Sequence, residues 1–295
     1  MRAADTWQDY QLIDTCDGER LERWGEYILI RPDPQIIWKT PRNAPEWKQA
    51  HARYIRSTTG GGHWQRLQPL PDHWTVSYRG SFEKPLQFHI KLMGFKHTGL
   101  FPEQAVNWEW MADAIRKAGR PIRVLNLFGY TGAATLACAA AGAHVTHVDA
   151  SKGMVTWGRE NVAASELADK PMRWLIDDCL KFVQREQRRG NTYDAILMDP
   201  PSYGRGPGGE VWKLEEQIYG LIEQCAKLLS DHPLFFIVNS YSAGLSPSVM
   251  QYILAALLAN RGGSCFADEI GLPVTRNGLI LPCGSTAVWH TVKQD

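Results

Sequence analysis

Apolar runs of strand length alternate with helix-like segments from about residue 99 to the end of this chain. Strands that alternate with helices in this way predict a doubly wound, mostly parallel α/β sheet of the Rossmann-like kind. Ser151 and Ser246 stand where helix N-caps are expected. Seven strands are predicted at residues 122–127, 145–148, 173–176, 195–198, 234–239, 264–269 and 285–291. Helices are predicted at residues 131–141, 152–164, 180–189, 215–229 and 247–260.

The first part of the chain has a different sequence pattern, with short strand-like segments in place of alternating strands and helices. Tyr27–Arg31 and Gln35–Lys39 resemble short strands broken by prolines, and residues 74–78 and 86–90 alternate between polar and apolar side chains as half-buried strands do. We therefore predict a small β-rich amino-terminal module at residues 1–98, followed by a ligand-binding domain at residues 99–295.

Bulk composition bounds the class of protein. The chain has 295 residues, of which 44% are apolar, and its net charge is +1. This composition allows a substantial core and does not by itself point to nucleic acid or membrane. Six cysteines lie far apart without a CxxC pair, so neither a metal site nor a disulfide framework is expected. With no apolar signal region and no run of transmembrane length, the sequence predicts a soluble, cytoplasmic protein.

A glycine turn follows the first strand of the predicted sheet. Residues 124–132 run from an apolar strand through a G-x-x-G turn, Gly129 to Gly132, into a helix. Glycine permits close backbone approach, and a helix N-terminus offers unpaired N–H groups to an anion. Asp149 lies about twenty residues further on, where a carboxylate accepts hydrogen bonds from ribose hydroxyls. This turn lacks both G-x-G-x-x-G and a G-K-[ST] ending, so the elements indicate an adenosine-containing ligand other than a dinucleotide.

An acidic residue followed by two prolines ends the strand at residues 195–198. Ligands of open α/β sheets bind outside the carboxyl ends of the strands. The prolines remove two backbone donors, which leaves the Asp199 carboxylate and the Pro200 carbonyl as acceptors for an exocyclic amine or a ring N–H. Tyr203 is a candidate to stack on a flat base, and the alternative is that it packs beneath the following loop.

Together these motifs resemble class I S-adenosylmethionine-dependent methyltransferases. More narrowly, the chain is similar to the large-subunit ribosomal RNA methyltransferase family that includes the cytosine-C5 enzymes. The segments that carry the resemblance are residues 98–104, 124–132, 147–151, 160–162, 177–178 and 199–203. The resemblance implies S-adenosylmethionine as cofactor and a methyltransferase activity.

The resemblance also implies roles for individual residues. Phe128, Gly129 and Thr131 would surround the methionine part of the cofactor, and Asp149 would hold both ribose hydroxyls with Ala150 beside the adenine. Asp178 or Asp177 would accept from the adenine amino group. The full predicted cofactor set is Phe101, Gln104, Phe128, Gly129, Tyr130, Thr131, Gly132, Asp149, Ala150, Ser151, Asp177, Asp178, Cys179 and Asp199. The predicted catalytic set is Asp199, Pro200 and Tyr203.

The methylated atom is predicted from the absence of a cysteine nucleophile after the fifth strand. Cytosine-C5 enzymes need a cysteine nucleophile after the fifth strand, and this chain has Ser240-Tyr241-Ser242 there. Cys283 is the other candidate near a strand start, and we expect it to be a structural thiol. Methylation of a nitrogen is therefore favoured over carbon, although amino-methyltransferases often place their aromatic residue directly after the prolines, where Ser202 stands here.

Residues 36–66 are locally basic and aromatic. Six basic residues stand against the single acidic Glu46. The basic residues are Lys39, Arg42, Lys48, Arg53, Arg56 and Arg66, interleaved with Trp38, Trp47, His51, Tyr54, His63 and Trp64. Such a pattern matches a surface that holds phosphates and stacks bases, and it also matches the core and surface of a small domain.

The glycine-rich loop at residues 204–213 adjoins the predicted site. It suits a lid that uses Arg205, Trp212 and Lys213 on substrate, or a solvated connection to the next helix. The leading hypothesis is a methyltransferase acting on a base of ribosomal or other structured RNA. The alternatives are a protein or small-molecule methyltransferase, and an RNA-associated module that binds the cofactor without catalysis.

Overall fold

The computed structural model describes residues 1–57, 61–205 and 211–292. The chain divides into two compact units. The sheet unit comprises Met1–Arg2, Ala105–Ile270 and the chain from Cys283 onward. The amino-terminal unit comprises Ala3–Gln104 together with Gly271–Pro282.

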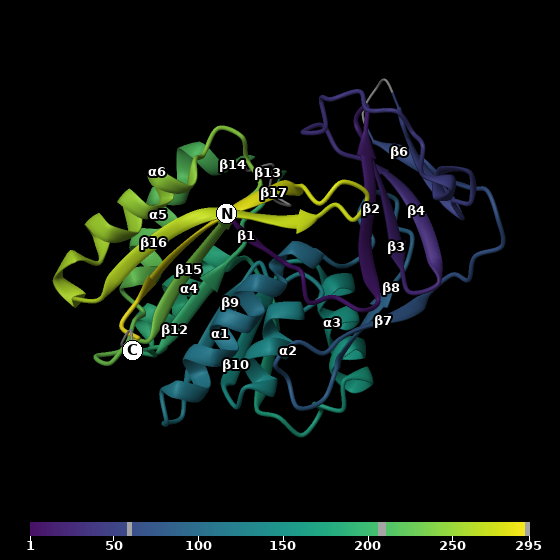
Figure 1. Cartoon of the computed structure of the whole chain (residues 1–295). Helices are drawn as coiled ribbons and strands as arrows, with labels where there is room; N and C mark the ends of the chain where they lie inside the picture. Colours follow the sequence, from purple (N-terminus) through teal and green to yellow (C-terminus); the bar gives the residue numbers. More distant parts are fainter. Residues whose placement is uncertain (58–60, 206–210, 293–295) are drawn as a thin grey trace. The chain divides into compact units, whose positions relative to one another are not determined.

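An eight-stranded sheet forms the centre of the sheet unit, in the order β1-β16-β17-β15-β12-β9-β10-β11 (Figure 1). Strands β11, β10, β9, β12 and β15 are parallel, and β17 runs antiparallel to β15. Their bounds are β1 Arg2–Ala3, β9 Arg123–Leu127, β10 His144–Asp149, β11 Met172–Ile176, β12 Ala195–Met198, β15 Phe235–Ser240, β16 Ser264–Pro273 and β17 Ile280–His290. The predicted mostly parallel sheet is confirmed, and the two-residue β1 is a strand beyond the seven predicted.

Two rows of helices connect the strands. Helices α1, α2 and α3 pack in succession, as do α4, α5 and α6. Their bounds are α1 Ala105–Lys117, α2 Ala133–Ala140, α3 Lys152–Ala164, α4 Cys179–Arg188, α5 Leu214–Ala226 and α6 Pro247–Leu257, followed by η3 Ala259–Arg261. The side chains of Ser151 and Ser246 accept hydrogen bonds from the third residue beyond them, which confirms both predicted N-caps. Helix α1 was not predicted.

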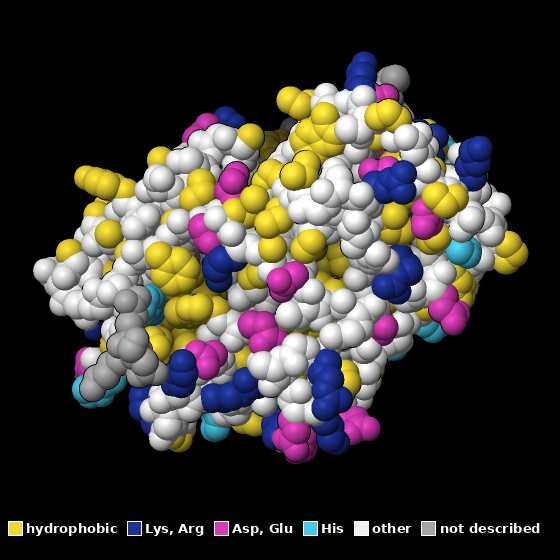
Figure 2. Space-filling model, in the orientation of Figure 1, with side chains coloured by type: hydrophobic (Ala, Val, Ile, Leu, Met, Phe, Trp, Pro, Cys, Tyr) yellow, Lys and Arg dark blue, Asp and Glu magenta, His cyan; other side chains and the backbone are white. Residues whose placement is uncertain are grey.

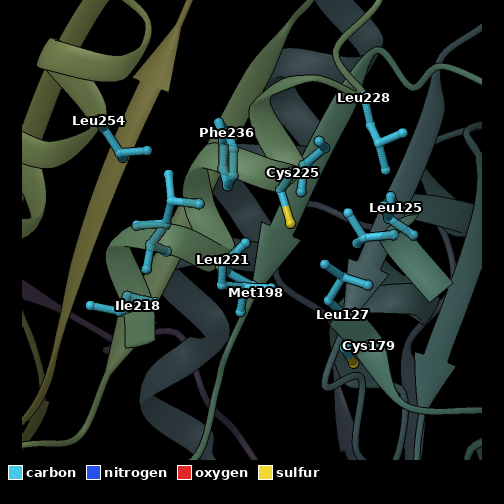
Figure 3. Close-up of a cluster of buried hydrophobic side chains, with 14 of the residues drawn as sticks. Leu125, Leu127, Cys179, Met198, Ile218, Leu221, Cys225, Leu228, Phe236 and Leu254 are labelled. Atoms are coloured by element: carbon cyan, nitrogen blue, oxygen red, sulfur yellow. The ribbon is translucent and has the colours of Figure 1, made fainter. Parts of the chain in front are cut away.

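A buried apolar cluster lies between the sheet and the second row of helices (Figure 3). Leu125 and Leu127 of β9 and Met198 of β12 belong to it, and they pack in the same cluster as Leu221 and Cys225 of α5. All five side chains are at most 3% exposed. Burial of a large apolar side chain contributes about 1.5–3 kcal/mol. This core fixes the carboxyl ends of β9 and β12, where the candidate site residues lie.

The amino-terminal unit is β-rich, as predicted. A five-stranded sheet has the order β2-β3-β4-β5-β6, and β7 pairs with β8. The bounds are β2 Tyr10–Cys16, β3 Glu19–Trp24, β4 Tyr27–Pro32, η1 Pro45–Lys48, β5 Ala52–Arg56, β6 Gly62–Arg66, β7 Trp74–Tyr78, β8 Leu86–Ile90 and η2 Pro102–Gln104.

One predicted strand in this unit is wrong. Residues 35–39 form an irregular segment, because the Asp33 side chain accepts from the Gln35 N–H at 3.1 Å and starts a turn. Burial does alternate along the segment, since Ile36 is 1% and Ile37 is 84% exposed, but residues 35–39 belong to no strand. The carbonyls of Ile36 and Trp38 instead accept from the turn between β2 and β3.

Candidate functional site

Three strands of the sheet end side by side. Leu127, the last residue of β9, pairs with Val148 of β10 on one side and with Met198 of β12 on the other. The chain runs outward from β9 in one direction to β10 and β11, and in the other to β12 and β15. Such a reversal of strand order is where open α/β sheets bind ligands.

The glycine turn after β9 has unusual backbone geometry. Phe128 and Tyr130 adopt left-handed conformations with φ of 57° and 50°, and Gly132 has φ of 83°. Left-handed non-glycine residues cost about 1–3 kcal/mol each and persist where their surroundings hold them. A methyl group on Gly129 would lie 2.3 Å from Cε1 of His147, so the backbone passes too close to that ring for any side chain.

Hydrogen bonds hold the turn from behind. The Gly129 N–H donates to the Val148 carbonyl at 3.0 Å, and the Asn161 side chain donates to the Thr131 carbonyl at 2.9 Å. This contact confirms the interpretation that Asn161 is a helix residue packing against the glycine loop. His147 lies 2.9 Å from the Thr135 hydroxyl, and burial lowers the pKa of His147 to about 3. The imidazole beneath the turn is therefore neutral.

Asp149 connects the turn to the next helix. Its carboxylate accepts from the Tyr130 N–H at 2.9 Å and from the Ser151 N–H at 2.8 Å. Burial raises the pKa of Asp149, and these two backbone N–H groups oppose the rise. Each carboxylate oxygen has a second lone pair, so acceptor capacity remains for ribose hydroxyls. Ala150 beside it is exposed.

The two acidic residues after β11, Asp177 and Asp178, make different contacts. Asp177 forms an ion pair with Arg185. Asp178 is exposed and caps α4, since its side chain accepts from the Lys181 N–H at 2.8 Å. The Cys179 thiol is buried and accepts from the Phe128 N–H at 3.3 Å, and burial raises its pKa. Cys179 is therefore a neutral structural thiol that supports the glycine turn, and its backbone N–H belongs to the open first turn of α4.

The diproline corner follows β12 directly. The Asp199 N–H donates to the Leu127 carbonyl at 3.5 Å, and Pro200 is buried. Tyr203 begins strand β13 (Tyr203–Arg205), which pairs with β14 (Val211–Lys213), and its side chain is 54% exposed. The indole N–H of Trp212 donates to the Pro201 carbonyl at 2.5 Å. That contact was not predicted from the sequence.

The neighbouring strand end, after β15, is held by packing and hydroxyl bonds. The Ser242 N–H donates to the Ser240 hydroxyl at 3.1 Å, and the Ser242 hydroxyl donates to Glu215. The Tyr241 ring lies beside Gly284, where a methyl group would be 2.9 Å from its Cε1. Cys283 in β17 is buried, at 8% exposure.

Two predicted groups of residues do not belong to the site described at these strand ends. Phe101 and Gln104 belong to the amino-terminal unit, where the Gln104 N–H donates to the Phe101 carbonyl at 3.1 Å. Their place beside the cofactor stays a prediction. The predicted lid at residues 204–213 falls partly on residues 206–210, which lie outside the described residues.

Within the described ranges, no group of three or more His, Cys, Asp or Glu side chains is arranged to hold a metal ion. The helices described there are also all too short or too polar to span a bilayer.

Comparisons with known proteins agree with this geometry. The S-adenosylmethionine-dependent methyltransferase family matches residues 44–226. A SAM-dependent methyltransferase from Agrobacterium tumefaciens is 37% identical, with a TM-score of 0.91 over 99% of this chain and 93% of that one. The structure of SMU.776 complexed with SAH shares the fold at a TM-score of 0.75 and 17% identity, over 97% of this chain and 76% of that one.

Curated relatives match a shorter region. The ribosomal RNA large subunit methyltransferase K/L of Shewanella sp. (strain ANA-3) is 33% identical over 147 residues, which are 49% of this chain and 20% of that protein. The protein of the same name from Hahella chejuensis is 33% identical over 150 residues, with 50% and 20% coverage. This chain thus spans about a fifth of the length of these relatives.

The chain belongs to the S-adenosylmethionine-dependent methyltransferase family, and S-adenosylmethionine is its cofactor. The residues present fit that group. The glycine turn leads into the open first turn of α2, whose N–H groups can donate to a carboxylate. Asp149 is a fixed acceptor at the end of the adjacent strand.

Proposed function

We propose that this methyltransferase modifies a nitrogen on a base of RNA, with ribosomal RNA as the first candidate. The observation that carries the proposal is the corner at Asp199 and Pro200, which adjoins the glycine turn and is followed by the exposed ring of Tyr203. The names of the relatives that share half of this chain, ribosomal RNA methyltransferases, support the choice of RNA.

On the cofactor side, each role is assigned to a group already held in place. The N–H groups in the first turn of α2, which follows the glycine turn, bind the methionine carboxylate, and Asp149 accepts from both ribose hydroxyls. Asp178, exposed at the start of α4, accepts from the adenine amino group, and the Cys179 N–H meets a ring nitrogen. We assign this role to Asp178 because Asp177 is already paired with Arg185.

When bound, the cofactor supplies an electrophilic methyl group that needs no acid or base to activate it. The protein has to align the acceptor and exclude water. The Asp199 carboxylate and the Pro200 carbonyl accept N–H bonds from the acceptor amine and direct its lone pair toward the glycine turn. Tyr203 stacks on the base, an interaction of about 1–3 kcal/mol.

Nitrogen is favoured because the strand end after β15 holds its side chains in structural contacts. Tyr241 stands where a cytosine-C5 enzyme needs its cysteine, and it packs beside Gly284. Cys283 is buried in β17. A C5 mechanism requires a thiolate that reaches the base, and a tyrosine does not provide one.

We also propose that the amino-terminal module presents the RNA, through fewer residues than its composition indicates. Arg42 and Arg53 both pair with Glu19 at 2.7 Å, and Arg66 pairs with Asp72 at 2.8 Å. The other three basic side chains, Lys39, Lys48 and Arg56, are exposed and available to phosphates.

The aromatic residues of this segment are largely occupied within the unit. The Trp47 indole donates to Asp14 at 2.9 Å, and the Trp64 indole donates to the Phe95 carbonyl at 3.0 Å. Basic and acidic side chains are interspersed on the face shown in Figure 2. RNA contact at this module is therefore proposed to be local and mainly electrostatic.

The test is transfer of tritium from labelled S-adenosylmethionine into an extract from cells that lack this gene. Label in RNA that RNase releases, with a methylated nitrogen found by mass spectrometry of the nucleosides, is the expected result. Label that resists RNase and is removed by protease would replace the proposal with a protein methyltransferase. A C5-methylated pyrimidine would reject the choice of nitrogen.

A further inference from the structure

One tryptophan lies between the two halves of the site. Trp212 in β14 stands opposite Gly204 of β13. Its indole N–H donates to the Pro201 carbonyl at 2.5 Å, and its ring centroid lies 6.1 Å from that of Phe128 at an interplanar angle of 41°. A single half-buried side chain thus contacts both the diproline corner and the glycine turn.

The contact with Pro201 constrains the diproline corner at Asp199 to Pro201. Proline fixes its own φ but leaves ψ open, and peptide planes are rigid. A hydrogen bond to the Pro201 carbonyl orients the peptide plane after Pro201. The Leu214 N–H then bonds the Ser202 carbonyl at 3.1 Å, which holds the next plane. The Pro200 carbonyl precedes two restrained residues, so its direction is limited as well.

The same short segment also reaches the next strand end. Glu215, three residues beyond Trp212, accepts from the Ser242 hydroxyl. The start of α5 is therefore bonded to the segments that follow β12 and β15. This arrangement braces the acceptor side of the site against the sheet.

We propose that Trp212 is a positioning residue for methyl transfer, holding the Pro200–Pro201 corner and Phe128 in one arrangement so that acceptor and cofactor are aligned. The proposal rests on the proposed role of Asp199 and Pro200 as acceptors for the methylated group. Trp212 acts through Pro201 and Phe128, and its substitution affects alignment more than cofactor binding.

Two substitutions separate its two contacts. Trp212→Phe keeps an aromatic ring beside Phe128 and removes the N–H donor, whereas Trp212→Leu removes both. Trp289→Phe is the matched control, because the Trp289 indole also donates to a backbone carbonyl, that of Gly262, at 2.9 Å in the same unit. Trp289 lies in β17, and its ring packs beside Gly263.

Each variant is measured in three ways: kcat and KM for tritium transfer into the whole extract, binding of S-adenosylhomocysteine by calorimetry, and the thermal midpoint. Trp212→Phe is expected to lower kcat by about 10- to 100-fold with cofactor affinity within about twofold of wild type. Trp212→Leu is expected to weaken S-adenosylhomocysteine binding about 5- to 10-fold as well. Trp289→Phe is expected to lower the thermal midpoint and leave kcat per folded molecule unchanged.

A wild-type kcat for Trp212→Phe, or a loss no greater than that of Trp289→Phe, would overturn the proposal. The kcat of each variant is compared with that of wild type on whichever acceptor takes the label. An RNase-resistant label therefore rejects RNA as substrate without deciding the role of Trp212. If wild type labels nothing in the extract, unchanged S-adenosylhomocysteine binding by Trp212→Leu would overturn it.

Discussion

Two regions of this enzyme, the cofactor edge from the glycine turn to Asp149 and the acceptor corner that follows β12, are held by different contacts. The cofactor edge is held by bonds between the ends of neighbouring strands and the segments that follow them, such as those from Tyr130 and Ser151 to Asp149. The acceptor corner, at Asp199 to Tyr203, is held from a later segment through Trp212 and Leu214. Its aromatic side chain, Tyr203, is half exposed.

This difference indicates which part of the site is general and which part is specific. A turn with no room at Gly129 and a carboxylate fixed by two N–H groups can bind one cofactor in enzymes with many substrates. An acceptor corner braced by a separate hairpin can change its substrate without disturbing the cofactor. Substitutions at the two places are therefore expected to have separable effects on cofactor binding and on methyl transfer.

The largest effect is expected for Gly129→Ala. The added methyl group would lie 2.3 Å from the His147 ring. That ring cannot move away freely, because its centroid lies 4.4 Å from the centroid of the Trp174 ring. Overpacking of this kind costs about 1–3 kcal/mol of stability and displaces the turn. Calorimetry should detect no S-adenosylhomocysteine binding at concentrations that saturate wild type.

Gly220→Ala in α5 is the control for this substitution, because a methyl group there meets nothing within 4 Å. It is expected to bind normally and to be slightly more stable, since alanine favours a helix. Normal binding by Gly129→Ala would show that the turn does not contact the cofactor.

A smaller loss is expected for Asp149→Ala. The substitution removes the acceptor of both ribose hydroxyls and releases two backbone N–H groups, so cofactor affinity should fall by about 1–3 kcal/mol. Asp169→Ala, at an exposed position, is the control. Calorimetric affinity equal to wild type would reject the role of Asp149.

The pH dependence of binding sharpens the same point. Both Asp149 oxygens accept hydrogen bonds, so the ionised form binds the cofactor. Because burial raises the pKa of Asp149, affinity should be constant near neutral pH and should fall as pH drops through a value above the ordinary 3.8 of aspartate. Asp149→Asn should bind more weakly and lose this step. A step that persists in Asp149→Asn would assign it to another group.

The smallest effect is expected for Tyr241→Phe. The ring that packs beside Gly284 is retained, and no catalytic nucleophile is needed there if a nitrogen is methylated. The kcat and KM for methyl transfer should stay within about twofold of wild type, since only one hydroxyl group is removed. An inactive variant would make the strand end after β15 part of the catalytic machinery.

Much of the sheet, and the helix cap at Ser151, could be predicted because local patterns specify them. The apolar run before Asp199 and the Ser151 cap each depend on residues close in sequence. The bond from Trp212 to Pro201 joins residues eleven positions apart across a hairpin, and no local pattern indicates it. Residues 35–39 were misread because the Asp33 side chain, rather than strand pairing, sets the backbone there.

A crystal structure with bound S-adenosylhomocysteine tests the cofactor assignment most directly. The expected structure has the ribose hydroxyls on the Asp149 carboxylate and the homocysteine carboxylate on the N–H groups in the first turn of α2, just after Gly132. Its sulfur should point toward the corner at Asp199 and Pro200. A ligand bound elsewhere, or a sulfur directed away from that corner, would contradict the assignment.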